Sequence, residues 1–193
     1  AERVLLRYSS EINKLNFLES ASIDILGHEC WVSRSGYTGE DGFEISIPNW
    51  GVEKIARSLL NETEVKPVGL GARDSLRMEA GLCLYGNELT EDISPVEASI
   101  SWSIQKSRRI KDSKRDHFIG AEKILEQIEN GTKSRRVALV PVGKAPLRQG
   151  CDLYDSAFSR EKIGYISSGG YSPSLKQPIS MAFVLSEFVK EGS

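Results

Sequence analysis

The 193-residue sequence has few cysteines and histidines, the residues that build disulfide frameworks and most zinc sites. Its three cysteines, Cys30, Cys83 and Cys151, are far apart, odd in number and outside any CxxC spacing, so neither a disulfide framework nor a zinc site is expected. The only two histidines, His28 and His117, have no partner at metal-ligand spacing, which also argues against a histidine-based catalytic triad. Scattered thiols of this kind are typical of a reducing compartment.

Long apolar runs and a surplus of one charge are missing as well. No run approaches the roughly 20 apolar residues that a transmembrane helix needs, and the N-terminal stretch AERVLLRYSS lacks a signal-peptide core. The 25 Lys and Arg residues nearly balance the 27 Asp and Glu residues, so no nucleic acid and no membrane is expected as a partner. The densest basic tract, residues 106–115, is predicted to be a solvated surface, with docking of an acidic partner as the alternative.

Alternating apolar and polar residues predict strands in the first half of the chain. An apolar content of 39% is enough to bury a core in one domain or two small ones. Residues 22–34 are predicted to form two strands with a tight connection at Gly27, and residues 43–47 a third strand after a glycine-rich turn. Residues 98–106 alternate in the same way, and we predict a further half-buried strand there.

Three segments with apolar residues on one helical face, or with strong helix formers, predict helices. Residues 49–61 carry such a stripe, with Asn49 as the expected N-cap. The segment 72–80 is rich in helix formers and is expected to end at Gly81, because glycine accommodates a left-handed cap. A third helix is predicted over residues 121–130.

The pattern changes near Gly131, where short strands begin to alternate with turns rich in Gly, Ser and Pro. Strands are predicted in RRVALVPV, EKIGYISS and ISMAFVL, and closely spaced strands of this kind favour a small barrel or sandwich. We therefore predict an α+β fold in which antiparallel sheets and packed helices fill residues 1–130. A small C-terminal β-barrel is predicted over residues 131–193.

Residue patterns alone give candidate binding residues and no reaction. Side chains alternate across a strand, so Glu44 must point away from the apolar face of residues 43–47. It is then either a solvated strand residue or a hydrogen-bond acceptor at the wall of a cleft. Arg73, at the start of the helix 72–80, is likewise either a surface partner of Asp74 or Glu79 or a ligand-binding residue.

Four blocks of sequence resemble the aminomethyltransferases, the T-proteins of the glycine cleavage system. In chain order they are RSGYTGEDGFEISIP, GLGARDSLRMEAGLCLYGNEL, SPVEASISW and SSGGYSPSLKQPISMAFV. The resemblance implies a folate-binding domain of the T-protein type followed by the barrel. It also implies a reaction in which the methylene carbon of an aminomethyl group is transferred to tetrahydrofolate with release of ammonia. The group is carried on the lipoyl arm of a partner, the lipoylated H-protein.

The resemblance also implies roles for individual residues. Glu44 matches the family's pterin-binding glutamate, whose carboxylate can accept paired hydrogen bonds from the ring. Arg73 and Tyr37 match an arginine and an aromatic residue at the same folate site. Arg136 is expected to be structural, bridging the barrel to the folate domain. Tyr85 and Trp102 are expected to pack in the core.

The resemblance covers only part of the family pattern. The resemblance implies that the family's N-terminal region, which carries a catalytic aspartate, and its last barrel strands have no counterpart in this sequence. No catalytic residue is therefore expected in this chain, and the isolated chain is expected to be inactive. The implied location is the mitochondrial matrix in a eukaryote or the cytoplasm in a bacterium. Two alternatives are the folate domain of a dimethylglycine or sarcosine dehydrogenase and a non-catalytic folate-binding relative in iron–sulfur protein maturation.

Overall fold

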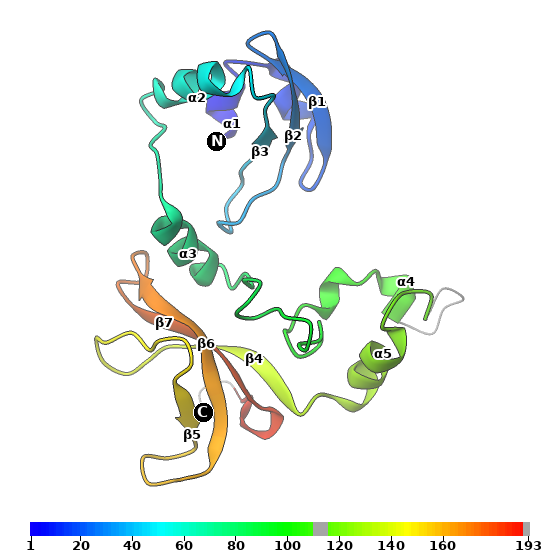
Figure 1. Ribbon diagram of the computed structural model, residues 1–193, viewed down its shortest axis with the longest axis vertical. Coiled ribbons are helices and arrows are strands. Elements are labelled where there is room, and N and C mark those ends of the chain that lie inside the picture. Colours follow the sequence, from blue (N-terminus) through cyan, green and yellow to red (C-terminus); the bar gives the residue numbers. More distant parts are fainter. Residues whose placement is uncertain (110–115, 191–193) are drawn as a thin grey trace. The chain divides into compact units, whose positions relative to one another are not determined.

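The computed structural model describes residues 1–109 and 116–190. The chain divides into two compact units, Ala1–Ala80 and Gly81–Ser193, each with secondary structure of its own (Figure 1). None of the helices in the described ranges combines the length and the apolar character that crossing a bilayer requires. The division predicted near Gly131, which would separate a folate-binding domain from a barrel, stays a prediction.

The first unit is a three-stranded antiparallel sheet with helices. Its elements are α1 (Glu2–Leu5), η1 (Ser10–Lys14), β1 (Ser20–Ile25), β2 (His28–Ser33), β3 (Glu44–Ser46), α2 (Val52–Leu60) and α3 (Leu70–Glu79). The strands lie in the order β1-β2-β3, as expected for two successive hairpins. All three strands predicted here are confirmed, and so are both predicted helices.

One face of this sheet is the core of the unit. Ile23 and Ile25 of β1 and Cys30 and Val32 of β2 are buried, and Ile55 of α2 joins the same cluster. The apolar residues Phe43, Ile45 and Ile47 pack against it. Because side chains alternate across a strand, the opposite face, which we call the polar face, carries Glu29, Ser33, Glu44 and Ser46 together with the exposed Trp31. The predicted orientation of the strand at residues 43–47 is therefore confirmed.

The helix boundaries differ from the predicted ones by two or three residues. Helix α2 begins after Gly51 and not after Asn49, because the amides of Gly51 and Val52 both donate to the Pro48 carbonyl and form a turn first. Helix α3 begins at Leu70, since the extended residue Gly69 serves as its N-cap. Its predicted end is confirmed, with Gly81 at a φ of 71°.

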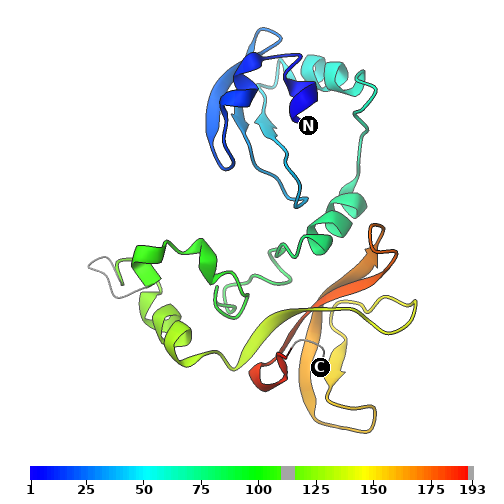
Figure 2. The ribbon, with the colours of Figure 1, turned by 180° about the vertical axis from the view of Figure 1, so that it is seen from behind.

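The second unit holds a four-stranded antiparallel sheet and several short helices. Its elements are η2 (Ser101–Ser103), α4 (Lys106–Arg109), α5 (Ala121–Asn130), β4 (Ser134–Leu139), β5 (Asp152–Tyr154), β6 (Lys162–Ser172), β7 (Gln177–Leu185) and η3 (Ser186–Phe188). The strand order is β4-β7-β6-β5, and β6 with β7 forms the longest hairpin (Figure 2). The buried centre of this sheet consists of Ile166, Ala182 and Val184. Helix α5 and the three predicted strands are confirmed.

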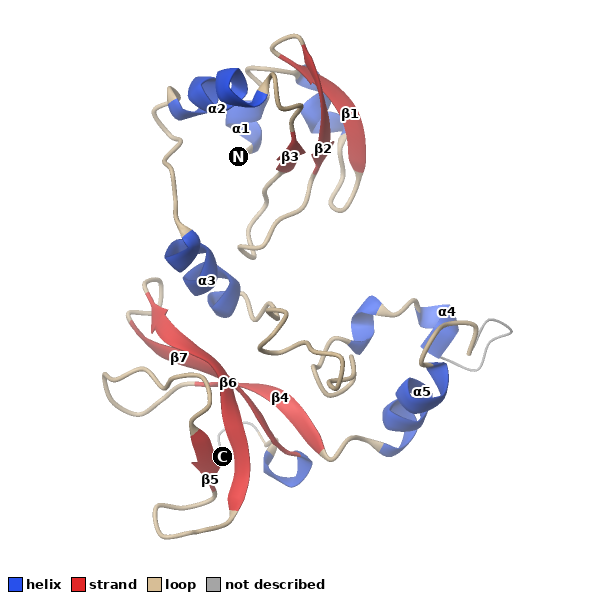
Figure 3. Cartoon of the chain, in the orientation of Figure 1, coloured by secondary structure: helices blue, strands red, loops and turns tan. Residues whose placement is uncertain are grey.

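The strand predicted at residues 98–106 is wrong. The segment forms the 3-10 helix η2 and the start of α4 instead (Figure 3). Ser99 has a φ of 59°, and the amides of Ala98 and Ile100 donate to the carbonyls of Ser94 and Pro95 in a compact turn. Local hydrogen bonds therefore satisfy the backbone groups that a strand would have offered to a neighbour.

The segment SGGYSPSLKQP, one of the turns rich in Gly, Ser and Pro that were expected between the C-terminal strands, is mostly strand. Strands β6 and β7 run through it and leave only residues 173–176 as the turn. A Cβ at Gly169 would lie 1.9 Å from the carbonyl oxygen of Leu147. This glycine permits a close approach of two backbones rather than a turn.

Candidate functional site

The loop that joins β2 to β3 is closed by an arginine at its base. Arg34 donates from Nε and Nη2 to the two carboxylate oxygens of Asp41, both at 2.8 Å. Its Nη1 donates to Glu2 and to the Leu15 carbonyl, and the guanidinium lies 5.3 Å from the centre of the Phe43 ring. The hydrogen bonds from Arg34 lower the pKa of the Asp41 carboxyl. The pair spans the loop and fixes both of its ends.

Glu44 lies at the start of β3, directly opposite Ser33 of β2. Its side chain is exposed on the polar face of the sheet. The hydroxyl of Ser35 donates to Glu44 Oε2 at 2.6 Å, and Ser33 Oγ lies 3.0 Å from Ser35 Oγ. The carboxylate is thus accessible and held through one of its oxygens.

Tyr37 and Arg73 meet although they are 36 positions apart in the sequence. The Arg73 guanidinium carbon lies 4.6 Å from the centre of the Tyr37 ring, a cation–π contact between the loop and α3. The loop approaches the end of α3 closely, since a Cβ at Gly39 would lie 2.5 Å from the Cβ of Ala80. Gly39 also has a φ of 79°, so the loop needs glycine there for two reasons.

Asp74, one of the two surface partners considered for Arg73 beside Glu79, is bound by a different arginine. Asp74 accepts from Arg77, at 2.8 Å from Nε and 2.7 Å from Nη2. Arg77 is 1% exposed, whereas Arg73 is exposed. The sequence reasoning missed Arg77, although its i,i+3 spacing from Asp74 was a usable signal. It also missed Arg34 and Ser35, whose contacts have no periodic signature.

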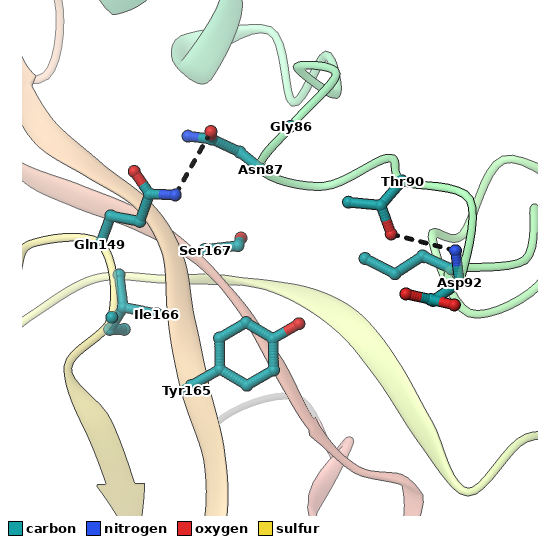
Figure 4. Close-up of a pocket in the computed structure, with 10 residues that line it drawn as sticks. Gly86, Asn87, Thr90, Asp92, Gln149, Tyr165, Ile166 and Ser167 are labelled. Carbon is teal, nitrogen blue, oxygen red and sulfur yellow. Dashed lines mark hydrogen bonds between the residues drawn. The ribbon is translucent and has the colours of Figure 1, made fainter.

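A pocket lies in the second unit, between the loop after α3 and strand β6 (Figure 4). It has a volume of about 340 Å³ and is lined by Gly86, Asn87, Thr90, Asp92, Ile93, Gln149, Gly150, Tyr165, Ile166 and Ser167. Gln149 Nε2 donates to Asn87 Oδ1 at 3.4 Å. Burial, together with the charges of Glu88 and Glu97, raises the pKa of Tyr165. None of the three predicted folate residues lines this pocket.

A buried carboxylate anchors the loop on this side of the pocket. Glu88 is 0% exposed and accepts from the Ser168 hydroxyl at 2.6 Å and from the Leu84 amide at 3.0 Å. Asn87 Nδ2 in turn donates to Ser168 Oγ at 3.0 Å. These bonds tie residues 84–90 to β6, which assigns Glu88 a structural role.

Two further expectations for the second unit are wrong and one is confirmed. Tyr85 is 71% exposed and Trp102 is 70% exposed, so neither packs in the core. Both belong to turns and a 3-10 helix that leave one side of the chain in solvent. Arg136 has a structural role, since its Nε donates to the Ala98 carbonyl at 2.7 Å and its Nη1 to the Gly81 carbonyl at 3.1 Å.

Two other properties bear on function, namely the capacity to bind a metal ion and the surroundings of the basic tract, residues 106–115. Among the residues that the structure describes, no three His, Cys, Asp or Glu side chains gather closely enough to hold a metal ion. The basic tract is described only from Lys106 to Arg109, and its remainder, residues 110–115, lies outside the described ranges. Within α4, Arg108 donates to the His117 carbonyl and Arg109 to the Ile104 carbonyl, while Lys106 is exposed.

Comparison with known proteins places these elements in a family. Residues 1–108 match the model of the GCVT N-terminal domain, and residues 135–193 match the model of the glycine cleavage T-protein C-terminal barrel domain. The predicted α+β fold with a C-terminal barrel is confirmed by these matches and by the antiparallel sheets.

Individual relatives agree with the family models. The mitochondrial aminomethyltransferase of Solanum tuberosum is 46% identical over 185 residues, covering 95% of this chain and 44% of the relative. That of Dictyostelium discoideum is 42% identical over 201 aligned residues, covering 100% of this chain and 48% of the relative. Among solved structures, the glycine cleavage system aminomethyltransferase T of Bartonella henselae matches with a TM-score of 0.89 at 38% identity, over 99% of this chain and 50% of that protein.

These names favour an aminomethyltransferase over the two alternatives considered for the sequence. The chain spans about half the length of the curated relatives that it matches. The N-terminal domain model matches the first part of the chain and the barrel model the last part. The first model alone covers more than half of the chain. The chain belongs to the T-protein family of the glycine cleavage system.

Proposed function

We propose that the protein is a tetrahydrofolate-dependent aminomethyltransferase of the glycine cleavage system. It transfers the methylene carbon of the aminomethyl group on the dihydrolipoyl arm of the H-protein to tetrahydrofolate, with release of ammonia. The observation that carries this proposal is the identity of 42% to 46% with proteins named aminomethyltransferase across nearly the whole chain. Because the chain spans about half of those relatives, the activity is proposed for the whole protein.

Glu44 is proposed to bind the pterin ring. A pterin presents adjacent N–H donors at one edge, and a carboxylate can accept two of them in a charge-assisted pair. Three observations support this role: Glu44 is exposed, its partner Ser35 occupies only one oxygen, and it lies on the polar face of β3. A flat, donor-rich edge can therefore approach this carboxylate.

Tyr37 and Arg73 are proposed to contact the rest of the folate. The guanidinium over the Tyr37 ring covers one face of the aromatic side chain, so the ligand would use the other face or the edge. Arg73 retains planar donors that suit a carbonyl or carboxylate of the ligand. All three side chains are proposed as binding residues, and none of them is proposed to be catalytic. Positioning of the two reactants is the main contribution expected from such a site.

The partner, the domains and the location are part of the same proposal. The lipoylated H-protein is the proposed partner, because members of this family take the aminomethyl group from the lipoyl arm of that protein. Residues 1–130 are proposed as part of the folate-binding domain and residues 131–193 as part of the barrel. The relatives named above as mitochondrial support a mitochondrial matrix location if the source is a eukaryote. In a bacterium the proposed location is the cytoplasm.

Calorimetric titration of tetrahydrofolate into the whole protein tests the site. Glu44→Ala should weaken binding by about 2 to 3 kcal/mol, roughly 30-fold to 150-fold, because a hydrogen-bonded charge is lost. Ser46→Ala is the matched control, since Ser46 lies on the same face of β3 and is also exposed. Unchanged binding in Glu44→Ala would make Glu44 a solvated strand residue and remove the folate site from this face.

A further inference from the structure

A short chain of hydroxyl groups leads to Glu44. Ser33 ends β2 and lies opposite Glu44 in the register of β2 and β3. Opposed residues of an antiparallel pair point to the same face, with Cβ atoms about 5 Å apart. Ser35 follows two residues later, with its Oγ at 2.6 Å from Glu44 Oε2 and 3.0 Å from Ser33 Oγ. Two serines and the carboxylate thus form one cluster on the polar face.

The direction of the two hydrogen bonds follows from the number of protons available. An ionised carboxylate only accepts, so Ser35 is the donor in the 2.6 Å bond. A serine hydroxyl has a single proton, and Ser35 has then used it. Ser33 must therefore donate to Ser35 in the 3.0 Å bond. Each bond polarises the next, which strengthens the one that reaches Glu44.

The backbone around Ser35 is held firmly. Arg34 is anchored by its bidentate bond to Asp41 and by its contacts with Glu2 and the Leu15 carbonyl. Its own backbone also pairs outside the β2–β3 ladder: the Leu18 amide donates to the Arg34 carbonyl at 2.9 Å, and the Arg34 amide donates to the Glu19 carbonyl at 3.0 Å. The hydroxyl of the next residue, Ser35, therefore has a defined position from which to donate.

We propose that Ser35, supported by Ser33, is a positioning residue that fixes the carboxylate of Glu44 for the ligand. This inference rests on the proposed function, in which Glu44 binds the pterin. A glutamate on an exposed strand loses side-chain freedom when a ligand orders it, and a hydrogen bond already in place reduces that loss. The bond from Ser35 uses one lone pair of Oε2, so Oε1 and the remaining lone pair of Oε2 are presented to the paired donors of the ring.

The test uses tetrahydrofolate titrations of the whole protein with five single variants, Glu44→Ala among them, and one double variant. Ser35→Ala should weaken binding about 5-fold to 20-fold, a smaller loss than that of Glu44→Ala, since the carboxylate remains but is no longer held. Ser33→Ala should cost about 2-fold to 3-fold, because it removes only the polarising bond. Ser35→Thr keeps the hydroxyl and should bind like the wild type. Ser46→Ala, on the same face, should also leave binding unchanged.

The double variant separates positioning from a general effect on the fold. In a Glu44→Ala background, Ser35→Ala should cause no further loss, because the group on which Ser35 acts is absent. Equal losses in both backgrounds, or a loss in Ser35→Thr as large as in Ser35→Ala, would overturn the inference. A loss in Glu44→Ala with none in Ser35→Ala would overturn it too, while leaving the proposed function intact. Unchanged binding in Glu44→Ala would instead overturn the proposed folate site itself.

Discussion

Two arginines one helical turn apart on α3 have opposite surroundings, and this difference separates stability from binding at the scale of single residues. Arg77 is 1% exposed and donates twice to Asp74. Arg73 is exposed and covers the ring of Tyr37. Removing the partner of a buried guanidinium destabilises the folded state, and so does replacing the guanidinium itself by a cavity. An exposed cation–π contact contributes only about 0.5 to 1 kcal/mol.

We therefore expect alanine at these two positions to affect different properties, stability at Arg77 and folate binding at Arg73. Arg77→Ala should lower the free energy of unfolding by about 2 to 4 kcal/mol, through the lost packing and the lost bonds to Asp74. Arg73→Ala should cost less than about 1 kcal/mol and should instead weaken tetrahydrofolate binding. Urea denaturation and folate titration of both variants measure this. Arg57→Ala removes an exposed i,i+4 pair with Glu53 and serves as the control. Equal destabilisation by the two α3 variants would contradict this separation.

The candidate site could be predicted only in part from single residues. The alternation Phe43, Glu44, Ile45 was enough to place Glu44 on the polar face, because strand geometry has a period of two. The contact between Tyr37 and Arg73 was beyond any local pattern, since it depends on how α3 meets the loop. The bond from Ser35 was missed for a similar reason: a serine in a loop has many local partners, and spacing does not choose among them.

At the scale of elements, periodicity succeeded where a segment packs on a core and failed where it does not. The strands β1 and β2 and the helix α5 all bury an apolar side, and each was predicted. Residues 98–106 alternate as regularly, but Trp102 points to solvent and a left-handed residue at Ser99 bends the chain. The strand β5 was not predicted, because no longer alternating run surrounds it as the run at residues 43–47 surrounds the equally short β3. Alternation thus indicates a strand only where a neighbouring strand is available.

Ion pairs of Arg3 and Arg7 with Glu64 connect α1 and the residues after it to the segment that follows α2. They should make the stability of the first unit depend on acid pH. Arg7 donates to Glu64 at 2.6 Å, and Arg3 donates to the same oxygen at 3.0 Å. The hydrogen bond from Arg7 is the largest cause that lowers the pKa of Glu64 from 4.5 to about 2. A carboxyl whose pKa is depressed in the folded state stabilises that state above its unfolded pKa. This contribution is lost as the pH falls through the folded value.

The expected consequence is a pH-dependent difference between the wild type and Glu64→Gln. The wild type should be the more stable of the two above about pH 5, and the gap should shrink between about pH 4.5 and pH 2. Denaturant unfolding of both proteins at several pH values measures this gap. Glu53→Gln, whose partner Arg57 is also exposed, should change stability little at any pH. A gap that stays constant down to pH 2 would show that the ion pairs of Glu64 do not contribute.

At the scale of the whole molecule, the two units have separate cores, and the proposed reaction needs a partner protein as well as folate. An electrostatic contact with a partner acts mainly on the rate of encounter and weakens as salt rises. The basic residues in the described part of the tract, 106–109, have two kinds of surroundings. Arg108 and Arg109 are bound to backbone carbonyls, so reversing their charge would disturb α4 itself. Lys106 is exposed at the start of this helix and is the suitable position for a charge reversal.

If the tract docks an acidic H-protein, Lys106→Glu should slow association with the lipoylated H-protein several-fold at low salt. The difference from the wild type should fade as the ionic strength approaches 1 M, where the screening length falls to about 3 Å. Stopped-flow or surface-based association rates over a salt series measure both effects. Lys123→Glu on α5 is the control, because Lys123 is exposed on a helix outside the tract. Equal rates and equal salt slopes for the wild type and Lys106→Glu would assign this end of the tract to the solvated surface. In that case, docking of the H-protein would have to be sought on another face of the protein.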